Sequence, residues 1–138
     1  MAAAPRDFNA EIIEEFRSNH GNVSAFPSGA LLLLHHHGAK TGEARVNPLV
    51  YLRDGERYAV FATKGGAPEH PAWYHNLRAD PRVEIELADR TFPALAAEAL
   101  GDERDRLFDA QARRMPQFGE YQRRADRKIP VMVLTAAG

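Results

Sequence analysis

The sequence predicts a mainly β protein with flanking helices (α+β), in which antiparallel strands form a closed or half-closed barrel. Two observations support this prediction. Apolar runs of strand length come in pairs joined by short turns, as at Asp54-Gly55 and Asp89-Arg90, and such turns join antiparallel strands. The helical patterns stand at the edges of these pairs, whereas a parallel α/β sheet would alternate strands with helices. A length of 138 residues suits one domain of ordinary size.

The N-terminal region predicts an amphipathic helix over residues 8–20. Its apolar side chains recur at helical spacing and form one stripe, which consists of Phe8, Ile12, Ile13 and Phe16. Asp7 is a suitable N-cap, and Gly21 ends the helix. We expect the stripe to pack on the core, with a partner or a membrane surface as the alternative. A loop over residues 22–29 completes an N-terminal segment, 1–29, and the barrel domain then covers residues 30–138.

The next elements follow in chain order from apolar runs and turn residues. Strands are predicted over residues 30–37, 45–53 and 57–63, with a glycine- and lysine-bearing loop over 38–44. Asp54-Gly55 predicts a type I′ turn between the second and third strands, because both residue types accept a positive φ. A loop over 64–70 leads to Pro71, which fits the first turn of a short helix that ends near Ala79.

The second half of the chain repeats the pairing pattern. Asp80-Pro81 breaks the short helix, and strands are predicted over residues 82–88 and 91–100. A helix is predicted over 102–115, a second short helix over 116–124, and an apolar strand over 130–135.

Composition excludes several function classes. Lys+Arg is 18 and Asp+Glu is 19, a net charge of −1, which argues against binding nucleic acid or anionic lipid through bulk charge. The absence of cysteine excludes a disulfide framework, a thiolate metal site and a cysteine nucleophile, and it fits a cytoplasmic protein. No apolar run reaches membrane-spanning length, and the first residues do not resemble a signal peptide.

Two motifs, a glycine- and lysine-bearing segment and a run of three histidines, are weak evidence for a phosphate-binding P-loop and a metal site. Residues 38–42 share glycine, lysine and threonine with a phosphate-binding P-loop but lack its spacing and precede a strand. In the His35-His36-His37 run, alternation along a strand puts His35 and His37 on one face and His36 on the other. A metal would need a third ligand, with His70 and His75 as candidates. We therefore favour histidines that face solvent or a polar pocket, and we expect no metal.

Three elements are typical of an anion site. The chain has only three lysines beside fifteen arginines, and two of them, Lys40 and Lys64, lie in glycine-bearing loops. Such loops let backbone N–H groups approach an anion, and Arg45 lies beyond the first loop. The helix that starts at Pro71 offers its N-terminus as a third element. Trp73 and Tyr74 adjoin it and would suit a ligand with a planar ring, or equally a wedge into the core.

These segments together resemble the deazaflavin-dependent nitroreductase family, whose members use coenzyme F420. Residues 38–49, residues 63–68 with 70–77, and residues 120–122 with 126–131 resemble the family's motifs in the same order. The resemblance spans about residues 30–136. It implies a split β-barrel of the pyridoxamine-phosphate-oxidase type and a reduced deazaflavin that passes a hydride to a bound acceptor.

The resemblance also implies a cofactor site. Lys40 and Arg45 take the positions that hold the phosphate and the polyglutamate tail, and Lys64 follows a hydroxyl residue, Thr63. The full set of implied cofactor-binding positions is Ala39, Lys40, Thr41, Arg45, Val46, Asn47, Pro48, Leu49, Val50, Phe61, Ala62, Thr63, Lys64, Ala72, Trp73, Tyr74, His75, Asn76 and Phe118.

The implied acceptor pocket consists of Val50, Met115, Phe118 and Tyr121. It is more apolar than in members with several tyrosines there, and the histidine run replaces a threonine-rich stretch. Tyr121, and after it Thr63, would polarise the acceptor: a quinone, a conjugated enone or a nitroaromatic.

Two alternative functions remain open: an FMN-dependent oxidoreductase on the same barrel, and a non-catalytic carrier of the cofactor or of a lipid-like ligand. We expect a monomer or a homodimer, located in the cytoplasm, with peripheral membrane contact through the N-terminal helix as a further expectation.

Overall fold

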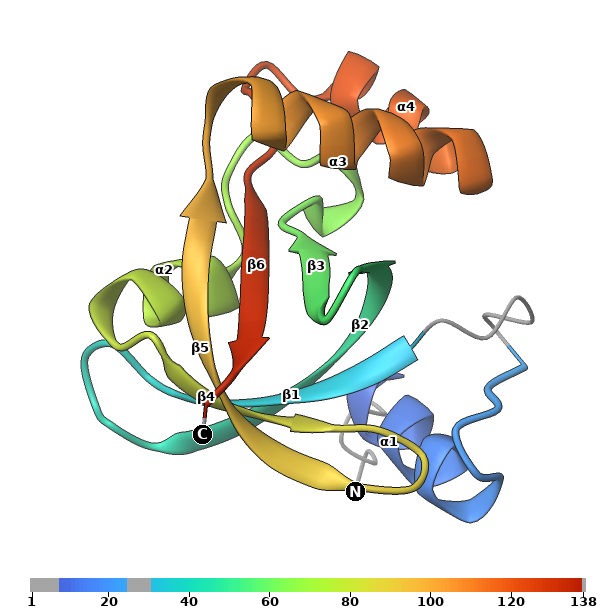
Figure 1. Ribbon diagram of the computed structural model, residues 1–138, viewed down its shortest axis with the longest axis vertical. Helices are drawn as coiled ribbons and strands as arrows, with labels where there is room; N and C mark the ends of the chain where they lie inside the picture. Colours follow the sequence, from blue (N-terminus) through green and yellow to red (C-terminus); the bar gives the residue numbers. More distant parts are fainter. Residues whose placement is uncertain (1–7, 25–30, 138) are drawn as a thin grey trace, which may run out of the picture.

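Six antiparallel strands close into a barrel in the computed structural model, which describes residues 8–24 and 31–137 (Figure 1). Around the barrel the order is β1-β2-β3-β6-β5-β4, and every neighbouring pair is antiparallel. The predicted antiparallel barrel is thus confirmed. The strands are β1 (Leu31–His37), β2 (Ala44–Asp54), β3 (Arg57–Phe61), β4 (Arg82–Glu86), β5 (Thr91–Ala99) and β6 (Val131–Ala136). The predicted boundary between residues 29 and 30 lies outside the described residues.

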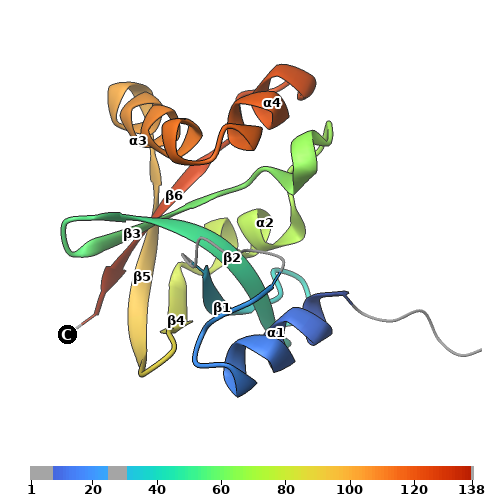
Figure 2. The same cartoon turned by 90° about the vertical axis from the view of Figure 1, so that its right-hand side faces the viewer.

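Four α-helices and one 3₁₀ turn surround the strands in the described part of the chain. They are α1 (Phe8–Ser18), the turn η1 (Lys64–Gly66), α2 (Ala72–Ala79), α3 (Gly101–Arg114) and α4 (Gln117–Arg124). Figure 2 shows α3 and α4 together at one end of the molecule and α1 at the opposite end, with α2 beside the barrel between them. None of the described helices is long and apolar enough to cross a membrane.

Two long strands close the barrel because each pairs with two neighbours in turn. The first part of β2 pairs with β1, and its last four residues pair with β3. In β5, residues 91–95 pair with β4 and residues 94–99 pair with β6. β2 and β5 therefore each form a corner of the barrel, at the point where one neighbouring strand replaces the other. The pairing registers of these strands determine where the loops after β1 and β3 lie.

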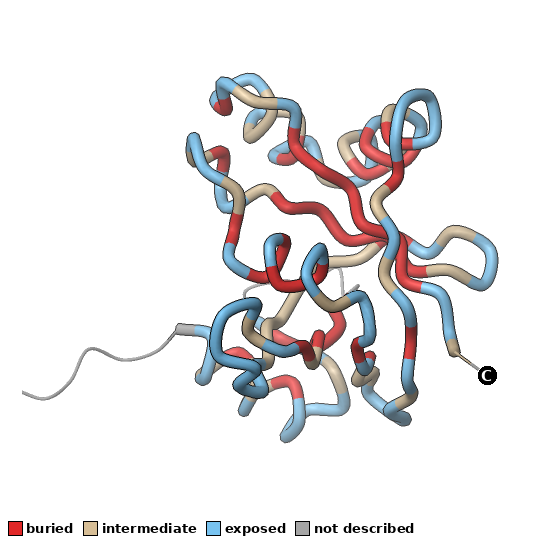
Figure 3. Tube along the Cα trace, turned by 90° about the vertical axis from the view of Figure 1, so that its left-hand side faces the viewer, coloured by how far each residue is buried: buried red, intermediate tan, exposed pale blue. Residues whose placement is uncertain are grey.

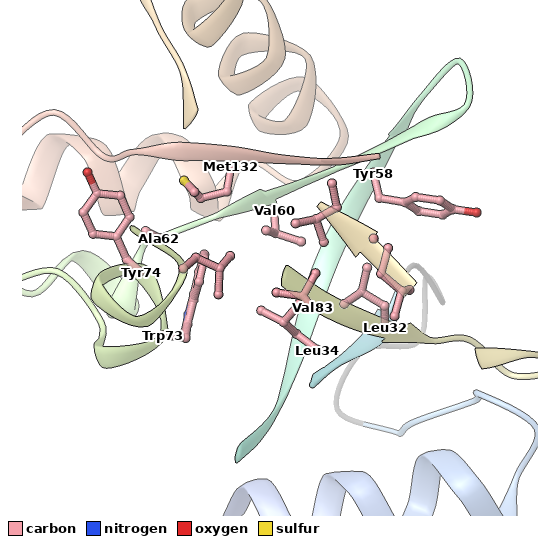
Figure 4. Packing of buried hydrophobic residues seen from close by; sticks show 13 residues of the cluster. Leu32, Leu34, Tyr58, Val60, Ala62, Trp73, Tyr74, Val83 and Met132 are labelled. Carbon is pink, nitrogen blue, oxygen red and sulfur yellow. The ribbon is translucent and has the colours of Figure 1, made fainter. Parts of the chain in front are cut away.

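Alternation along β1 divides its side chains between two cores. Leu32 and Leu34 lie fully buried inside the barrel with side chains from the other strands (Figure 4). Leu31 and Leu33 point the other way and pack against α1. Both faces of this strand are apolar because both are covered, and Figure 3 shows the buried residues concentrated along such strands.

A third core joins the outer face of β3 and β6 to the helices α3 and α4. Phe61, Val131 and Val133 pack there against Phe108 and Phe118. The Phe61 ring meets both other rings edge to face, with centroids 6.0 Å from Phe108 and 5.6 Å from Phe118. This core fixes α4 over the end of β3, where the Lys64 loop begins.

The apolar stripe of α1 is used within the protein. Ile12 and Phe16 are buried against Leu31 and Leu33, as expected of a stripe that packs on the core. Arg17, one residue further, donates two hydrogen bonds of 2.9 Å to the carboxylate of Glu86 on β4.

The β2–β3 hairpin turns one residue later than predicted. Asp54 pairs with Arg57 as the last position of the ladder, so Gly55 and Glu56 form the turn. Of the two turn residues, only Gly55 has a positive φ, +61°, whereas a type I′ turn needs a positive φ at both. The predicted type I′ turn at Asp54-Gly55 is therefore wrong. Arg57 also pairs with the Asp54 carboxylate, which favours keeping Asp54 in the strand.

Candidate active site

A hollow of about 390 Å³ lies between the loop that follows β1 and the first turn of α2. It is lined by Gly38, Ala39, Lys40, Thr41, Arg45, Ala72, His75 and Asn76. No acidic side chain is among these lining residues, whereas Lys40 and Arg45 bring two positive charges. The Arg45 guanidinium lies 3.7 Å from the Glu43 carboxylate, and both side chains are more than half exposed. The hollow therefore has the charge of an anion site.

The loop on one side of the hollow is a tight turn. The Gly38 N–H donates to the Glu43 carbonyl and the Gly42 N–H to the Gly38 carbonyl, both at 2.9 Å. Gly42 has a φ of +72°, a conformation that favours glycine. A Cβ at Gly38 would come within 2.9 Å of the Thr41 hydroxyl, which would have to move.

The other side of the hollow is the N-terminus of α2. Pro71 is the N-cap residue, and no side chain caps the helix. The N–H groups of the first turn are thus left without a side-chain acceptor, and the helix dipole adds partial positive charge. Two of the three predicted anion-binding elements therefore line the same hollow.

A buried chain of hydrogen bonds links this hollow to the barrel. His36 is 2% exposed, and its Nε2 lies 2.7 Å from Oδ1 of Asn47 on β2. The Nδ2 of Asn76 lies 3.3 Å from the other ring nitrogen, and Asn76 Oδ1 accepts the Ala39 N–H at 2.8 Å. Burial is the main cause that lowers the pKa of His36, so the imidazole is neutral at neutral pH.

Sequence reasoning did not place His36 in the site. Alternation separated it correctly from His35 and His37, and it lies on the same face as Leu34, inside the barrel. A polar side chain that continues a run of inward leucines is the signal that could have identified it, because a buried polar group needs partners.

The third predicted element, the loop that carries Lys64, lies elsewhere. Lys64 does not line the hollow, and its Nζ lies 2.9 Å from Glu69 Oε1. Arg127 holds this loop: its guanidinium donates to the carbonyls of Thr63 and Ala67, each at 3.0 Å, and to His70 Nδ1 at 2.9 Å. Burial lowers the pKa of Arg127. Arg127 follows α4, and Arg124 of α4 itself donates to the Gly65 carbonyl at 3.3 Å, so the loop is fixed against this end of the helix.

The two aromatic residues of α2 point into the barrel. Trp73 and Tyr74 are about 5% and 4% exposed and pack with Ala62 and Met132 (Figure 4). The Tyr74 hydroxyl donates to Glu98 Oε1 at 2.7 Å. Burial, and then this carboxylate, raise the pKa of Tyr74. Both rings therefore serve the core, and Ala72, His75 and Asn76 are the residues of α2 that line the hollow.

The predicted acceptor residues converge on one apolar cluster. Phe118 belongs to the core beneath α3 and α4, and Val50, Met115 and Tyr121 pack against it, half-buried. The Phe118 and Tyr121 rings are 5.5 Å apart. The remaining predicted positions on β2, Val46 to Leu49, are also half-buried, whereas Phe61 and Ala62 on the β3 side are buried.

Across residues 8–24 and 31–137, no three histidine or acidic side chains are grouped to hold a metal ion. His35 instead contacts Glu86, with its Nε2 2.8 Å from Oε1.

Comparison with known proteins decides the family. The sequence model of the F420H(2)-dependent quinone reductases matches residues 9–136. The chain belongs to this family. An F420H(2)-dependent quinone reductase of Mycobacterium tuberculosis is 40% identical over 125 residues, which cover 87% of this chain and 84% of that protein.

Solved structures agree with this assignment. An F420-H2 dependent reductase is 37% identical, with a TM-score of 0.70, and the match covers 76% of this chain and 93% of that chain. A second structure, described as a domain-swapped dimer, is also 37% identical, with a TM-score of 0.71 over 76% of this chain and 79% of that chain. A Listeria innocua protein assigned to the pyridoxamine 5′-phosphate oxidases shares the fold, with a TM-score of 0.57 at 10% identity over 96% of this chain and 95% of that chain.

Family membership confirms four predictions: the split barrel, an oxidoreductase, coenzyme F420 as cofactor in preference to FMN, and the relationship to F420-dependent enzymes. The hollow fits such a cofactor, because two cations, a helix N-terminus and no lining carboxylate suit a phosphate with a carboxylate-rich tail.

Proposed function

We propose that this protein reduces quinones with a hydride from reduced F420, and that the hollow between the Gly38–Ala44 loop and α2 holds the anionic part of the cofactor. The main support is the composition of the hollow, which joins Lys40, Arg45 and the start of α2 without a lining carboxylate. When bound, the deazaflavin supplies the hydride, and the protein's task is to bind, orient and shield.

The proposed roles divide between the loop and the strands. Lys40 and Arg45 bind phosphate and tail carboxylates, because charge-assisted hydrogen bonds are the strong ones. The half-buried stretch of β2 from Val46 to Val50 lines the deazaflavin ring. Thr63 and Lys64, which Arg127 holds in place, approach the ring from the other loop.

The acceptor side is proposed to be the cluster around Phe118. Val50 and Met115 offer apolar contact to a flat quinone, and the half-buried Tyr121 offers a phenol beside them. A quinone that receives a hydride develops an oxyanion, which a hydrogen-bond donor stabilises. We assign that role to Tyr121.

Anaerobic titration with F420 and with FMN tests the cofactor assignment. We expect low-micromolar or tighter binding of F420 and much weaker binding of FMN, which lacks the glutamate tail. Lys40→Ala and Arg45→Ala are each expected to weaken F420 binding about tenfold, since each removes one charged contact. Lys128→Ala is the control, because Lys128 lies with Asp105 away from the hollow. Stoichiometric FMN without F420 binding would contradict the proposal.

Turnover separates an enzyme from a carrier. Oxidation of reduced F420 is followed with menadione, a cyclohexenone and a nitroaromatic, and we expect menadione to be the best acceptor. Binding of F420 without turnover on any acceptor would favour the carrier.

We further propose a homodimer, since one relative of 37% identity is described as a domain-swapped dimer. Light scattering of the purified protein tests this.

Location in the cytoplasm and peripheral contact with membranes stay predictions. Liposome sedimentation tests the latter, and the buried stripe of α1 leaves only its polar face for such contact.

A further inference from the structure

We propose that His36 is a positioning residue that fixes the Gly38–Ala44 loop through Asn76, and that a proton on His36 releases the loop and weakens cofactor binding. The identity of the ligand rests on the proposed function. The hydrogen-bond chain itself belongs to the protein alone, so the two can fail separately.

The directions of the hydrogen bonds are determined by the loop. The Ala39 N–H can only donate, so it fixes Oδ1 of Asn76 as its acceptor, at 2.8 Å. The Nδ2 group of Asn76 therefore faces His36 and donates to Nδ1. Nδ1 must be unprotonated, and Nε2 carries the hydrogen that is donated to Asn47. Only the neutral Nε2–H form of His36 satisfies every member of the chain.

A proton on Nδ1 cannot be accommodated without breaking this chain. It would face the Nδ2 donor of Asn76, and two donors repel. If the Asn76 amide turned to present Oδ1 to His36, its Nδ2 would face the Ala39 N–H, again donor against donor. In the first case the bond between Asn76 and His36 is lost. In the second case the Asn76 amide has rotated, and the Ala39 N–H loses its acceptor. Since Ala39, Lys40 and Thr41 line the hollow, freeing Ala39 disturbs the ligand-binding turn.

The charged groups around His36 come from four elements. On its own strand the neighbours are His35 and His37, and Arg45 faces it from β2. Arg82 and Glu84 on β4 line a second hollow, of about 300 Å³, together with His36. His75 lies on α2 beside Asn76. Burial first, and then Arg45, lower the pKa of His36 against the hydrogen bond to Asn47, which raises it. The neutral form therefore prevails until the medium is acidic.

The first test needs no ligand. Histidine ring nitrogens and backbone amides are followed by NMR from about pH 8 to about pH 4, which covers the usual histidine range and extends below it because burial lowers the pKa of His36. We expect the Nε2–H form of His36 at neutral pH, and an Ala39 amide resonance that shifts with the same midpoint as His36. An Nδ1–H form, or an Ala39 amide that does not follow His36, would overturn the proposal.

The second test compares F420 affinity across pH in matched variants. In His36→Gln, the neutral amide can donate to Asn47 and accept from Asn76 but takes up no proton. We expect the dissociation constant of the native protein to rise about fivefold or more towards acid pH, and that of His36→Gln to lack this rise. Any titration of F420 itself affects the native protein and the variants equally, so it does not contribute to the difference between their pH profiles. His37→Gln, which removes an exposed neighbouring imidazole that lowers the pKa of His36, should keep the rise and move its midpoint only towards higher pH.

The outcomes separate the two proposals. Equal pH profiles for the native protein and His36→Gln would overturn the role of His36 while leaving the proposed function intact. A native protein that binds no F420 at any pH would refute the proposed function, and the coupling between His36 and Ala39 would then be decided by NMR alone.

Discussion

Gly66 has less room for a side chain than the other glycine of the Lys64 turn. Its φ is +84°, and a Cβ would lie 3.0 Å from the Tyr121 carbonyl oxygen and 3.2 Å from the Arg124 Cβ. Gly66→Ala is therefore expected to lower the free energy of unfolding by about 2–4 kcal/mol, from left-handed strain and overpacking together. Chemical denaturation measures this loss.

Gly65 supplies the matched control. Its φ is +63°, but a Cβ there would have no neighbour within 4 Å. Gly65→Ala should cost only the conformational strain, about 1 kcal/mol. Equal losses for the two variants would mean that the contact of this turn with α4 does not restrict residue 66.

Tyr121 is the residue at which the proposed chemistry can be tested most directly. Tyr121→Phe keeps the ring packed beside Phe118 but removes the hydroxyl. We expect kcat with menadione to fall roughly a hundredfold, the scale of a lost proton or hydrogen-bond donor, with F420 affinity unchanged. Tyr51→Phe, which removes a half-buried phenol packed against Tyr58, should leave kcat as it is. An unchanged kcat in Tyr121→Phe would remove the assigned role.

Individual residues also show which features of the site cannot be predicted from the sequence. Alternation along β1 separated His36 from its neighbours, but it does not say which face is enclosed. That depends on closure of the barrel and on α2, which brings Asn76 to the ring from forty residues away. For the same reason, the sequence placed Lys64 in a glycine-bearing loop but could not show that it lies outside the hollow of Lys40 and Arg45.

At the scale of elements, the carboxylate of Glu86 on β4 attaches α1 to the barrel by hydrogen bonds from Arg17. Glu86 accepts two bonds from Arg17 and contacts His35, and these contacts, Arg17 first, lower the pKa of Glu86. A lowered pKa in the folded state adds stability above the unfolded value, about 4.3 for glutamate. That stability is lost as the pH falls through the folded value.

Glu86→Gln is therefore expected to be less stable than the native protein at neutral pH, with a difference that closes towards pH 3 or so. Urea unfolding at a series of pH values measures the difference. Glu84→Gln, an exposed carboxylate on the same strand, should stay within about 0.5 kcal/mol of the native protein. A Glu86→Gln difference that does not change with pH would mean that the carboxylate contributes nothing through its charge.

Elements were predictable where local pattern and tertiary packing agree. The strand and helix periods along the chain match the observed order, because each apolar face has a partner core: the barrel interior, α1, or α3 with α4. The β2–β3 turn was misplaced by one residue because the Asp54–Arg57 pair extends the ladder. Asp is itself a common turn residue, so its type alone does not show that Asp54 ends the strand instead of starting the turn.

For the molecule as a whole, the near-zero net charge conceals an uneven distribution. Eighteen basic and nineteen acidic residues nearly cancel, and several described arginines form ion pairs with carboxylates, as Arg57, Arg82 and Arg106 do. The hollow of Lys40 and Arg45 has no acidic lining residue, and the Glu43 carboxylate near Arg45 is exposed and 3.7 Å away. The net charge of −1, which argues against nucleic-acid binding, is therefore compatible with the binding of a small polyanion in this one hollow.

This distribution predicts how salt acts on binding. Raising the salt from about 0.05 M to about 0.5 M shortens the screening length severalfold, so F420 affinity should fall about tenfold. A deazaflavin riboside, which lacks phosphate and tail, should bind more weakly and show almost no dependence on salt. Duplex DNA should not bind even at the lower concentration, because a net charge of −1 gives no long-range attraction. Equal salt dependence of F420 and the riboside would place the recognition of the cofactor in its ring and contradict an electrostatic role for Lys40 and Arg45.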